Sequence, residues 1–412
     1  MGHGKFKVID ADSHLQDALS HWVDYVEPEY WDRRPRIRVV EEEGGEWGLH
    51  HAELLPCELN PNPPAYQVAG GMTRTQGLTK DSGGSRRGRE EMRDYMPKKY
   101  GEAYYADFDA QSRIKDMDKY GWDKMVCIPT ASTGSLGWSR AEGREQAYLW
   151  ALARAWHNWC RDFCDADPQR LYMVADMPNQ HDIEGMVTES QRAVGKLNAV
   201  TVMMPKSTKE RPWESEEYDP FYNLSQELDF PVSFHGVLSR DPHTASRYQP
   251  RASVPGQQVA MDHAIGFPFE NMISLAHIIY MGVLERFPNM RVSFLEGNAG
   301  WLPWWIGRLD DHAMGTRRQG IWYDAPLLPL APSDYFRRQG FVACDGDEWA
   351  LSSVIEQGWG SNVVWNTDYP HPDAPDPDDA LQDFLKQPIS DEAKGKILWD
   401  NPARLYGDRL VA

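Results

Sequence analysis

Histidines and carboxylates that follow short apolar runs are the residues of this chain best placed to do chemistry. Asp12 and His14 follow an apolar run near the N-terminus, His235 follows a second run, and Asp368 follows a third near the C-terminus. Because Asp12 and His14 are two residues apart, both side chains point to one face of an extended backbone and can reach the same ion. Oxygen and nitrogen donors of this kind suit zinc, manganese or iron. The pattern therefore predicts a metal site.

Each of these residues, taken alone, has an ordinary structural explanation. An Asp-x-His pair often caps a helix, and Asp368 before Tyr369 and Pro370 could anchor a turn. Together with Glu296, however, they stand at the ends of four predicted strands. Barrel enzymes keep their chemistry at the carboxyl ends of their strands, so the joint placement favours a functional site.

The elements that must position these residues follow a regular rhythm. Eight strand-like apolar runs alternate with helical patterns, as in an α/β protein with parallel strands. The predicted strands lie near residues 6–12, 124–128, 171–176, 199–204, 231–235, 291–296, 341–345 and 362–368. Apolar residues at helical spacing predict helices at 146–163, 219–228 and 270–287. We therefore predict that residues 1–412 form a single domain, a (β/α)8 TIM barrel.

One segment departs from this rhythm. Between residues 41 and 105 the chain is polar and rich in Gly, Pro and Arg. We interpret it as a long insertion after the first strand and helix, either an irregular surface excursion or a lid over the active site. An insertion after the first barrel strand emerges at the catalytic mouth, which favours the lid.

Composition and charge indicate the class of partner. The formal net charge of the 412 residues is -19, and this acidity excludes nucleic acid and anionic membranes as expected partners, because both would repel the chain. We expect a small-molecule substrate. The five cysteines are odd in number, and Cys160 and Cys164 have helical spacing, so we expect reduced thiols in a cytoplasmic protein.

Several motifs together resemble a known family. They are Val8 to His14, Phe234-His235-Gly236, Gly282 to Pro288, Phe294 to Pro303 and Asn366 to His371. The chain resembles the amidohydrolase superfamily, in its amidohydrolase-2 branch related to aminocarboxymuconate-semialdehyde decarboxylase and to resorcylate-type decarboxylases. The resemblance covers residues 6–40 and 107–405.

The resemblance implies a cofactor, its ligands and an assembly. It implies one divalent metal ion held by Asp12, His14, His235 and Asp368. We expect zinc, with manganese or iron as alternatives. Relatives in this branch are often dimers, so the resemblance also implies a homodimer.

Two departures from the family pattern bear on mechanism. Many members begin with His-x-His or Glu-x-His, whereas this chain has Asp12 in the first place. The decarboxylases carry a histidine after strand six, where this chain has Asn298. Glu296, two residues earlier and on the same strand face, is the best substitute, as a general acid or base or as an extra ligand. The structural alternative is a glutamate hydrogen-bonded to a neighbouring strand or to Arg308.

The remaining histidines receive lesser roles. His263, beside a predicted loop at Phe267-Pro268-Phe269, is a further candidate acid for the reaction. His277 lies in an apolar helical pattern, which predicts a buried side chain with a satisfied hydrogen bond. We expect His371 and Asn298 to hydrogen-bond the groups around the metal.

Aromatic and basic residues suggest how a flat acid would bind. Trp301, Phe267 and Tyr105 are the expected pocket residues. Trp304 and Trp305 are expected to pack helices onto the barrel. The basic residues Arg86, Arg87 and Arg89 could grip a substrate carboxylate, although a solvated loop is the better expectation.

These expectations support one main function and three alternatives. The main one is metal-assisted hydrolysis of a C–N or C–C bond in an aromatic or conjugated carboxylic compound, with Asp368 as proton carrier and Glu296 or His263 protonating the developing charge. The same site could run in reverse as a dehydrative ring closure. Non-oxidative decarboxylation of an aromatic acid is the chief rival, and a catalytically inactive binding barrel is the third alternative.

Overall fold

The structure of the protein is a computed structural model. It describes residues 4–15, 22–34, 37–39, 51–54, 67–68, 95–106, 108–129, 145–178, 182–205, 212–235, 257–314, 327–371 and 373–411. The predicted basic residues Arg86, Arg87 and Arg89 lie outside this range, and so does Cys57.

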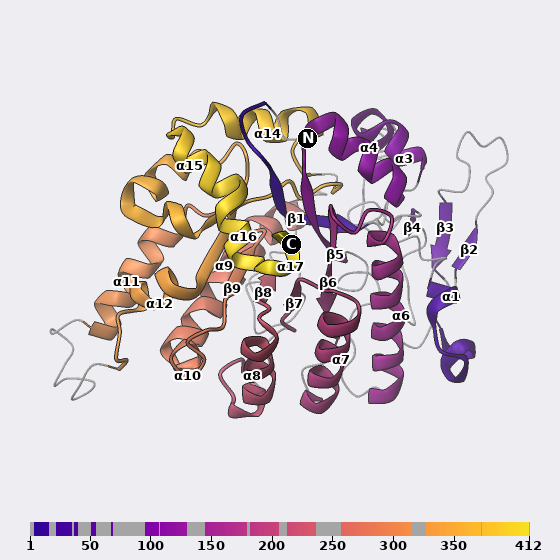
Figure 1. Cartoon of the computed structure of the whole chain (residues 1–412), viewed down its shortest axis with the longest axis horizontal. Helices are drawn as coiled ribbons and strands as arrows, with labels where there is room; N and C mark the ends of the chain where they lie inside the picture. The colour runs from indigo at the N-terminus through magenta and orange to yellow at the C-terminus, as the bar shows by residue number, and fades with distance from the viewer. Residues whose placement is uncertain are drawn as a thin grey trace.

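Eight parallel strands form a nearly closed barrel with helices around it (Figure 1). The strands are β1 Ile9–Leu15, β5 Lys124–Pro129, β6 Leu171–Asp176, β7 Thr201–Met203, β8 Val232–His235, β9 Val292–Leu295, β10 Gly340–Cys344 and β11 Val363–Trp365. They pair in that order, so each barrel strand lies beside the next one along the chain. The predicted TIM barrel is confirmed, and every predicted strand overlaps an observed one.

The barrel closes differently where its first and last strands meet. Between β1 and β11 the described residues form no regular ladder. Two backbone hydrogen bonds join them just beyond β11, from His14 N to Tyr369 O at 2.7 Å and from Asp368 N to Asp12 O at 3.0 Å. We call the contact between residues 10–15 and 366–371 the seam.

Helices follow the strands and cover the outside of the barrel (Figure 1). They are α1 Trp22–Tyr25, α3 Glu102–Tyr105, α4 Ala110–Tyr120, α6 Gln146–Cys164, α7 Ile183–Lys196, α8 Asp219–Leu228, α9 Gln257–Tyr280, α10 Val283–Arg286, α11 Leu302–Met314, α12 Pro332–Gln339, α13 Leu351–Val354, α14 Pro377–Lys386, α15 Asp391–Gly395, α16 Asn401–Tyr406 and α17 Asp408–Val411. The predictions of helices at 146–163 and 219–228 are confirmed by α6 and α8.

The prediction for the third helix was partly wrong. Helix α9 begins at Gln257, 13 residues before the predicted start, and Pro268 lies inside it. The expected loop at Phe267-Pro268-Phe269 is therefore helical. A proline removes one backbone hydrogen bond, but packing of a helix can outweigh that loss, and Phe267 is buried. The helix ends before Gly282, whose left-handed backbone begins α10.

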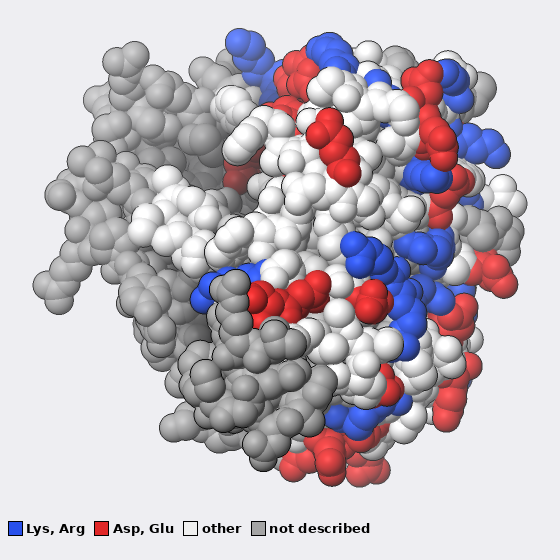
Figure 2. Space-filling model, turned by 90° about the vertical axis from the view of Figure 1, so that its left-hand side faces the viewer, with Lys and Arg blue, Asp and Glu red and all other residues white. Residues whose placement is uncertain are grey.

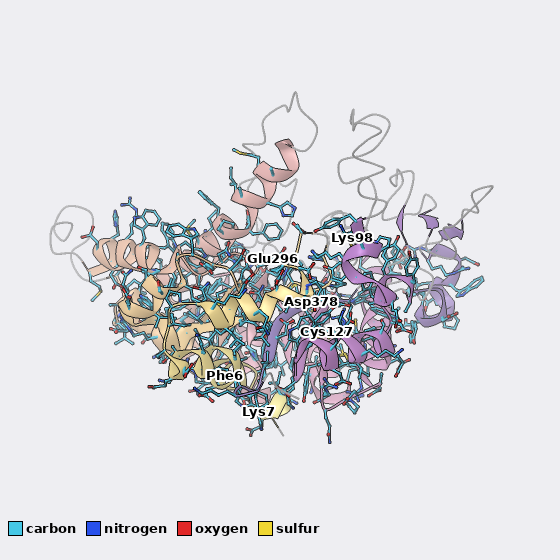
Figure 3. All side chains as sticks on the ribbon, turned by 90° about the horizontal axis from the view of Figure 1, so that it is seen from above. Phe6, Lys7, Lys98, Cys127, Glu296 and Asp378 are labelled. Atoms are coloured by element: carbon cyan, nitrogen blue, oxygen red, sulfur yellow. The ribbon has the colours of Figure 1, made fainter. Side chains whose placement is uncertain are left out.

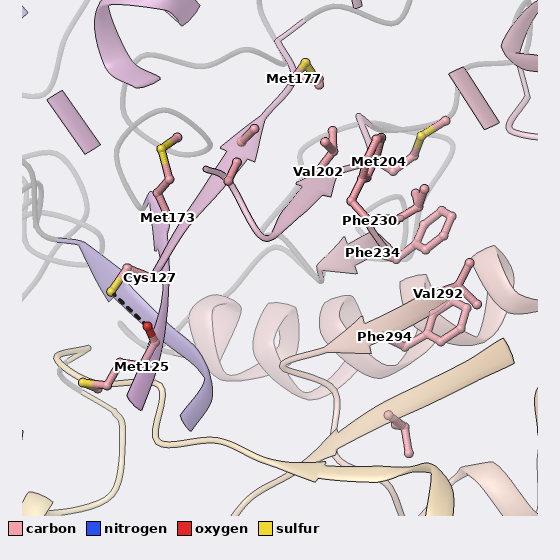
Figure 4. Close-up of a cluster of buried hydrophobic side chains, with 14 of the residues drawn as sticks. Met125, Cys127, Met173, Met177, Val202, Met204, Phe230, Phe234, Val292 and Phe294 are labelled. Carbon is pink, nitrogen blue, oxygen red and sulfur yellow. Dashed lines mark hydrogen bonds between the residues drawn. The ribbon is translucent and has the colours of Figure 1, made fainter. Parts of the chain in front are cut away.

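Strand side chains alternate between two hydrophobic clusters. An inner cluster fills the barrel and contains Ile9, Ala11 and Val126. An outer cluster lies between the strands and the helices, and Figure 4 shows part of it, including Met125, Cys127, Met173, Val202, Phe234 and Phe294. Successive strand residues therefore point to opposite faces, as the period of two requires.

Part of the predicted insertion is described. Its strands β3 His51–Leu54 and β4 Gln67–Val68 form a small antiparallel sheet with β2 Ile37–Val39, which lies just before the insertion. Near its end the insertion is helical, and it is anchored on the loop that follows Asp368, since the Tyr100 hydroxyl donates to His371 O at 2.5 Å. The sequence predicted neither the sheet nor this anchor. Its role as a lid stays a prediction.

Charged side chains lie on the described surface (Figure 2), and the described cysteines are buried. On the face shown in Figure 2, acidic and basic side chains are interspersed over the described surface. Among the described helices, none is both long and apolar enough to cross a membrane. Cys127, Cys160, Cys164 and Cys344 are buried free thiols.

Candidate metal centre and active site

A bulge in β1 aims Asp12 and His14 at one point. Ile9 and Ala11 face the inner cluster, whereas Leu15 packs in the outer one. The strand register shifts between Asp10 and Ser13, and a bulge of this kind re-aims the side chains that follow it. His14 and Asp12 then share a face, as their spacing predicted. The strand continues through His14 rather than ending before it.

His235 and Glu296 come from neighbouring strands with regular pairing. His235 is the last residue of β8 and pairs with Leu295, the last residue of β9. Glu296 follows directly, with a left-handed backbone (φ 50°) that turns its carboxyl toward His235, 2.9 Å from Nε2. Figure 3 shows Glu296 at the opposite end of the barrel from Phe6 and Lys7, which precede β1.

Asp368 reaches the site from the segment after β11. Its backbone is also left-handed (φ 56°), a strained conformation for a residue with a side chain. Its Oδ1 lies 3.1 Å from His14 Nε2 and 2.7 Å from His371 Nδ1. The ring of His371 stacks on that of His14 with 3.9 Å between centroids. His371 therefore lies where it can orient Asp368, and it is also near enough to be a ligand.

The donor atoms of these residues fit a divalent metal ion. Asp12 Oδ1 lies 3.4 Å from His14 Nε2, and Asp12 Oδ2 lies 3.7 Å from His235 Nε2. Two groups, Asp12 with His14 and His235, and His14 with Asp368 and His371, each place their donor atoms within 4.8 Å of one another. Both oxygens of Asp12 are buried and accept no hydrogen bond of good geometry from the described residues. Leaving a carboxylate in that state is costly, and a cation would satisfy it.

Burial and mutual contact shift the protonation of this cluster. Burial alone would lower the pKa of His14, but the adjacent Asp12 and Asp368 raise it to about 10. Burial would raise the pKa of Asp368, but His371 and His14 hold it below its usual range. Burial and then the charge of Asp368 raise the pKa of Glu296 well above its usual value. These shifts favour the protonated forms of His14 and Glu296, and a bound cation would supply positive charge to the same carboxylates.

A fully buried carboxylate behind the site was missed by the sequence analysis. Asp10 accepts hydrogen bonds from Asp12 N at 3.2 Å and Thr367 N at 3.1 Å, and also from the Thr367 hydroxyl. It therefore joins the two sides of the seam. Its place in an apolar run, two residues before Asp12, was the only signal in the sequence.

Two further carboxylates that the sequence analysis missed, Glu348 and Asp345, hold the loop after Glu296. Glu348 accepts hydrogen bonds from Ala299 N and Gly300 N, and Asp345 accepts one from Asn298 Nδ2 at 2.7 Å. Burial raises the pKa of Glu348 to about 7 and that of Asp345 to about 6. Asn298 was expected beside the metal, and the contact that the structure gives it is with Asp345, at the end of β10.

The other predicted histidines have different partners. His263 lies within α9, and its Nδ1 is 3.1 Å from Asp373 Oδ2, in the loop after Asp368. His277 pairs with Glu214 at 3.0 Å and is only partly buried, so the prediction of a buried side chain was wrong in that respect. Helix α9 turns His277 toward Glu214 at the barrel surface, where a carboxylate can reach it.

The predicted aromatic residues are dispersed. Phe267 is buried, with its ring 6.5 Å from that of His235. Trp301 donates to Gly297 O at 3.0 Å, within its own loop, and Tyr105 is 61% exposed. Trp305 packs as expected and donates to Met272 O, but Trp304 is 64% exposed, so the expectation that it packs a helix onto the barrel was wrong. Adjacent residues of a helix point in different directions, and only one of the two indoles faces α9.

A small cavity, about the size of one water molecule, opens beside His235. Its wall is mixed, with three apolar side chains and an imidazole, a carboxyl, an amide and a hydroxyl group. The lining residues are Met204, Trp213, Phe234, His235, Glu270, Asn271 and Ser274. None of the three predicted pocket aromatics lines it. Trp213 and Phe234 meet edge to face at 5.5 Å, so a flat group would find aromatic surface there.

Comparison with characterised proteins gives one decarboxylase relative. The chain is 22% identical, over 258 residues, to the 2-amino-3-carboxymuconate-6-semialdehyde decarboxylase of Dictyostelium discoideum. The match covers 62% of this chain and 66% of that enzyme, just under two thirds of its length.

Solved structures of similar fold cover nearly the whole chain. An amidohydrolase from Mycobacterium avium subsp. paratuberculosis K-10 has a TM-score of 0.69 at 17% identity, covering 98% of this chain and 100% of its own. The 5-carboxyvanillate decarboxylase of Novosphingobium aromaticivorans DSM 12444, solved with manganese and 3-methoxy-4-hydroxy-5-nitrobenzoic acid, has a TM-score of 0.64 at 17% identity, covering 98% of this chain and 99% of its own. At such identities the likeness establishes the fold alone. The family model described as Amidohydrolase matches residues 9–407, so this chain belongs to the amidohydrolase family, in its amidohydrolase-2 branch.

Proposed function

We propose that this protein is a metal-dependent, non-oxidative decarboxylase of an aromatic acid with a hydroxyl group next to its carboxylate. The observation that carries the proposal is Glu296, a largely buried acid 2.9 Å from His235 in a cluster of metal-ligand type. Two relatives named above are decarboxylases. The sequence alone favoured hydrolysis, and these comparisons support its decarboxylase alternative better.

Four residues are assigned to the metal. Asp12, His14, His235 and Asp368 would hold one divalent ion, manganese or zinc. When bound, the ion would supply positive charge that orients the substrate's carboxylate and favours the ionised, electron-rich form of the neighbouring hydroxyl, which makes the ring carbon easier to protonate. His371 would keep Asp368 oriented through their 2.7 Å contact, the kind of support that ligating carboxylates receive in metal sites.

Glu296 is assigned to protonate the ring. Its proton would move to the ring carbon that bears the carboxylate, forming a C–H bond. The C–C bond to the carboxylate then breaks, its electron pair returns to the ring, and carbon dioxide leaves. Glu296 regains a proton from solvent, so the reaction consumes one proton for each carbon dioxide released. His263, held by Asp373 at 3.1 Å, is the alternative donor.

The cavity beside His235 bears on the shape of the substrate. Its aromatic wall at Trp213 and Phe234 favours a flat group. Phe267, Trp301 and Tyr105 remain our candidates for the wider pocket.

Metal content is the first test of this proposal. Elemental mass spectrometry on the purified protein should find about one equivalent of manganese or zinc. His235→Ala and Asp368→Asn should each lower that content, whereas the matched control His312→Ala, which removes a histidine on α11, should keep it. A wild-type protein that holds no metal and gains none on reconstitution would remove the decarboxylase and hydrolase proposals together.

Turnover separates the two chemistries. Reconstituted protein mixed with hydroxybenzoates should release carbon dioxide, and in deuterated water the product ring should carry deuterium at the former carboxylate carbon. Glu296→Gln should keep the metal and lose at least 100-fold in turnover. Hydrolysis of aromatic amides without release of carbon dioxide would instead support the hydrolase function. Metal loss in Glu296→Gln would make Glu296 a ligand.

We also propose a homodimer, on the strength of the family resemblance, and a cytoplasmic location, because reduced thiols are expected from the cysteine pattern. Light scattering of the purified protein tests the assembly, and a mass of a single chain would contradict it.

A further inference from the structure

Arg113 is a fully buried cation that the proposed reaction does not use. It lies on α4 with an exposed fraction of 0%, and within the described chain it forms no direct salt bridge with a carboxylate. Its Nε has no hydrogen-bond partner among the described residues. Taking a charge out of water costs several kcal/mol, so such a residue persists only where its other contacts repay that cost.

The contacts of Arg113 reach both sides of the seam. Its Nη2 donates to the backbone oxygen of His14 at 2.5 Å, and its Nη1 lies 3.5 Å from the Ser13 hydroxyl. Its guanidinium carbon stands 4.6 Å from the ring centroid of Tyr369, a cation–π contact. Ser13 and His14 belong to β1, whereas Tyr369 directly follows Asp368.

The same helix holds Tyr369 at a second point. Asp116, one turn beyond Arg113 on α4, accepts a hydrogen bond from the Tyr369 hydroxyl. Residues three apart on a helix lie on one face, so α4 presents a cation and a carboxylate together. Tyr369 is therefore held by its ring face and by its hydroxyl.

The seam needs such support because it lacks a ladder. Only two backbone hydrogen bonds among the described residues join its two sides there, and both involve the peptide groups of Asp12, His14, Asp368 and Tyr369. A small rotation of the backbone at His14 would move the imidazole and break the hydrogen bond from His14 N to Tyr369 O.

We infer that Arg113 is a positioning residue for the metal site: by binding the His14 carbonyl and the Tyr369 ring, it keeps His14 and Asp368 at ligand spacing. This inference rests on the proposed metal site. The planar guanidinium suits the task because it donates to the carbonyl in its own plane and stacks on the ring with its face. A lysine could reach the carbonyl but could not stack in this way.

Metal affinity, measured apart from activity, tests the inference. Apoprotein is titrated with Mn²⁺, and free Mn²⁺ is followed by electron paramagnetic resonance. Arg113→Met should weaken binding 10- to 100-fold, the range found when groups that orient metal ligands are lost, and Arg113→Lys should weaken it less. The resonance of the bound ion should also change shape, because its ligand geometry changes. Arg113→Lys keeps the test open if Arg113→Met fails to fold.

The matched control is Asn362→Ala. Asn362 is a buried side chain just before β11, at the end of that strand away from Asp368, and it donates to Phe336 O and Gly340 O. Its loss should lower stability with no change in Mn²⁺ affinity. Equal affinities in Arg113→Met, Arg113→Lys and Asn362→Ala would overturn the role of Arg113 and leave the proposed function intact. A wild-type protein that binds no Mn²⁺ or Zn²⁺ would overturn both.

Discussion

The site is assembled from two regions that are built in different ways. On one side, His235 and Glu296 stand at the ends of β8 and β9, whose backbones pair in continuous register. On the other side, Asp12, His14 and Asp368 stand on the seam. In place of a regular ladder, two backbone hydrogen bonds and several side chains join the described strands there. We call the first region the ladder side.

The difference predicts where the site is vulnerable. Ladder hydrogen bonds are numerous and independent of side-chain identity, so substitution of a neighbouring side chain leaves the backbone in place. Across the seam, side chains of Asp10 and Arg113 contact both sides, and the Tyr406 hydroxyl on α16 holds the β1 side by donating to Ala11 O at 2.8 Å. Changes at these residues should therefore disturb metal binding, although none of them is a proposed ligand.

Among the substitutions that test this difference, Asp10→Ala should have the largest effect on stability and on Mn²⁺ affinity. The substitution removes the acceptor for Asp12 N, Thr367 N and the Thr367 hydroxyl, all of them buried. Unsatisfied buried donors cost about 1–3 kcal/mol each, so the free energy of unfolding should fall by about 3 kcal/mol or more. Mn²⁺ affinity should fall at least 10-fold, because both seam strands lose their shared partner. Chemical denaturation of the apoprotein and Mn²⁺ titration measure the two effects.

The isosteric Asp10→Asn is the control for Asp10→Ala. Its side-chain oxygen can still accept from Asp12 N and Thr367 N, so most of the stability and affinity should return. An Asp10→Ala variant with wild-type Mn²⁺ affinity would show that the seam does not depend on this carboxyl group.

The sequence was informative about the barrel for a physical reason. Strand residues with a period of two and apolar runs are local signals, and all eight strands were predicted from them. Residues at strand ends converge in any barrel, so the closeness of Asp12, His14, His235, Glu296 and Asp368 also followed. The bulge in β1 did not, because it depends on pairing with β5.

The supporting residues could not be predicted because their partners are distant in sequence. Arg113 is 99 residues from His14, and Asp10 is 357 residues from Thr367. In the sequence, a single arginine in a helical pattern gives no sign of whether its side chain is buried between two strands or solvated. The same holds for Trp304 and Trp305, whose exposure depends on the orientation of α11 against α9.

The ladder side is also supported by the Glu348 carboxyl group, and the effect of this group on stability should depend on pH. Burial first, and then the charge of Asp345, raise the pKa of Glu348 from its usual 4.5 to about 7. Between those values the folded protein holds a proton that the unfolded chain has lost, so stability falls as pH rises from about 4.5 to about 7. Below about pH 4.5 both states are protonated, and this destabilisation vanishes.

Glu348→Gln tests this linkage. The variant cannot titrate there, so the decline in the free energy of unfolding between pH 4.5 and 7 should be smaller by about 3 kcal/mol than in the wild type. Denaturation curves at several pH values measure the slope. Asp347→Asn, which changes an exposed carboxylate on the same loop, is the control and should leave the slope unchanged. A parallel decline in wild type and Glu348→Gln would assign the pH dependence to other groups.

The smallest expected effects come from a matched pair of substitutions. One removes a neutral hydrogen bond on the seam, and the other removes a neutral hydrogen bond on the ladder side. Tyr406→Phe removes the bond to Ala11 O on the seam, and Ser293→Ala removes the 2.8 Å bond to the Ser233 hydroxyl between β9 and β8. Each should lower the free energy of unfolding by about 1 kcal/mol, the usual net value of such a bond. Only Tyr406→Phe should weaken Mn²⁺ binding, by a few fold, because Ala11 is joined by its peptide bond to Asp12. Equal loss of affinity in both variants would mean that the seam and the ladder side support the metal alike, and that the missing ladder between β1 and β11 has no consequence for the site.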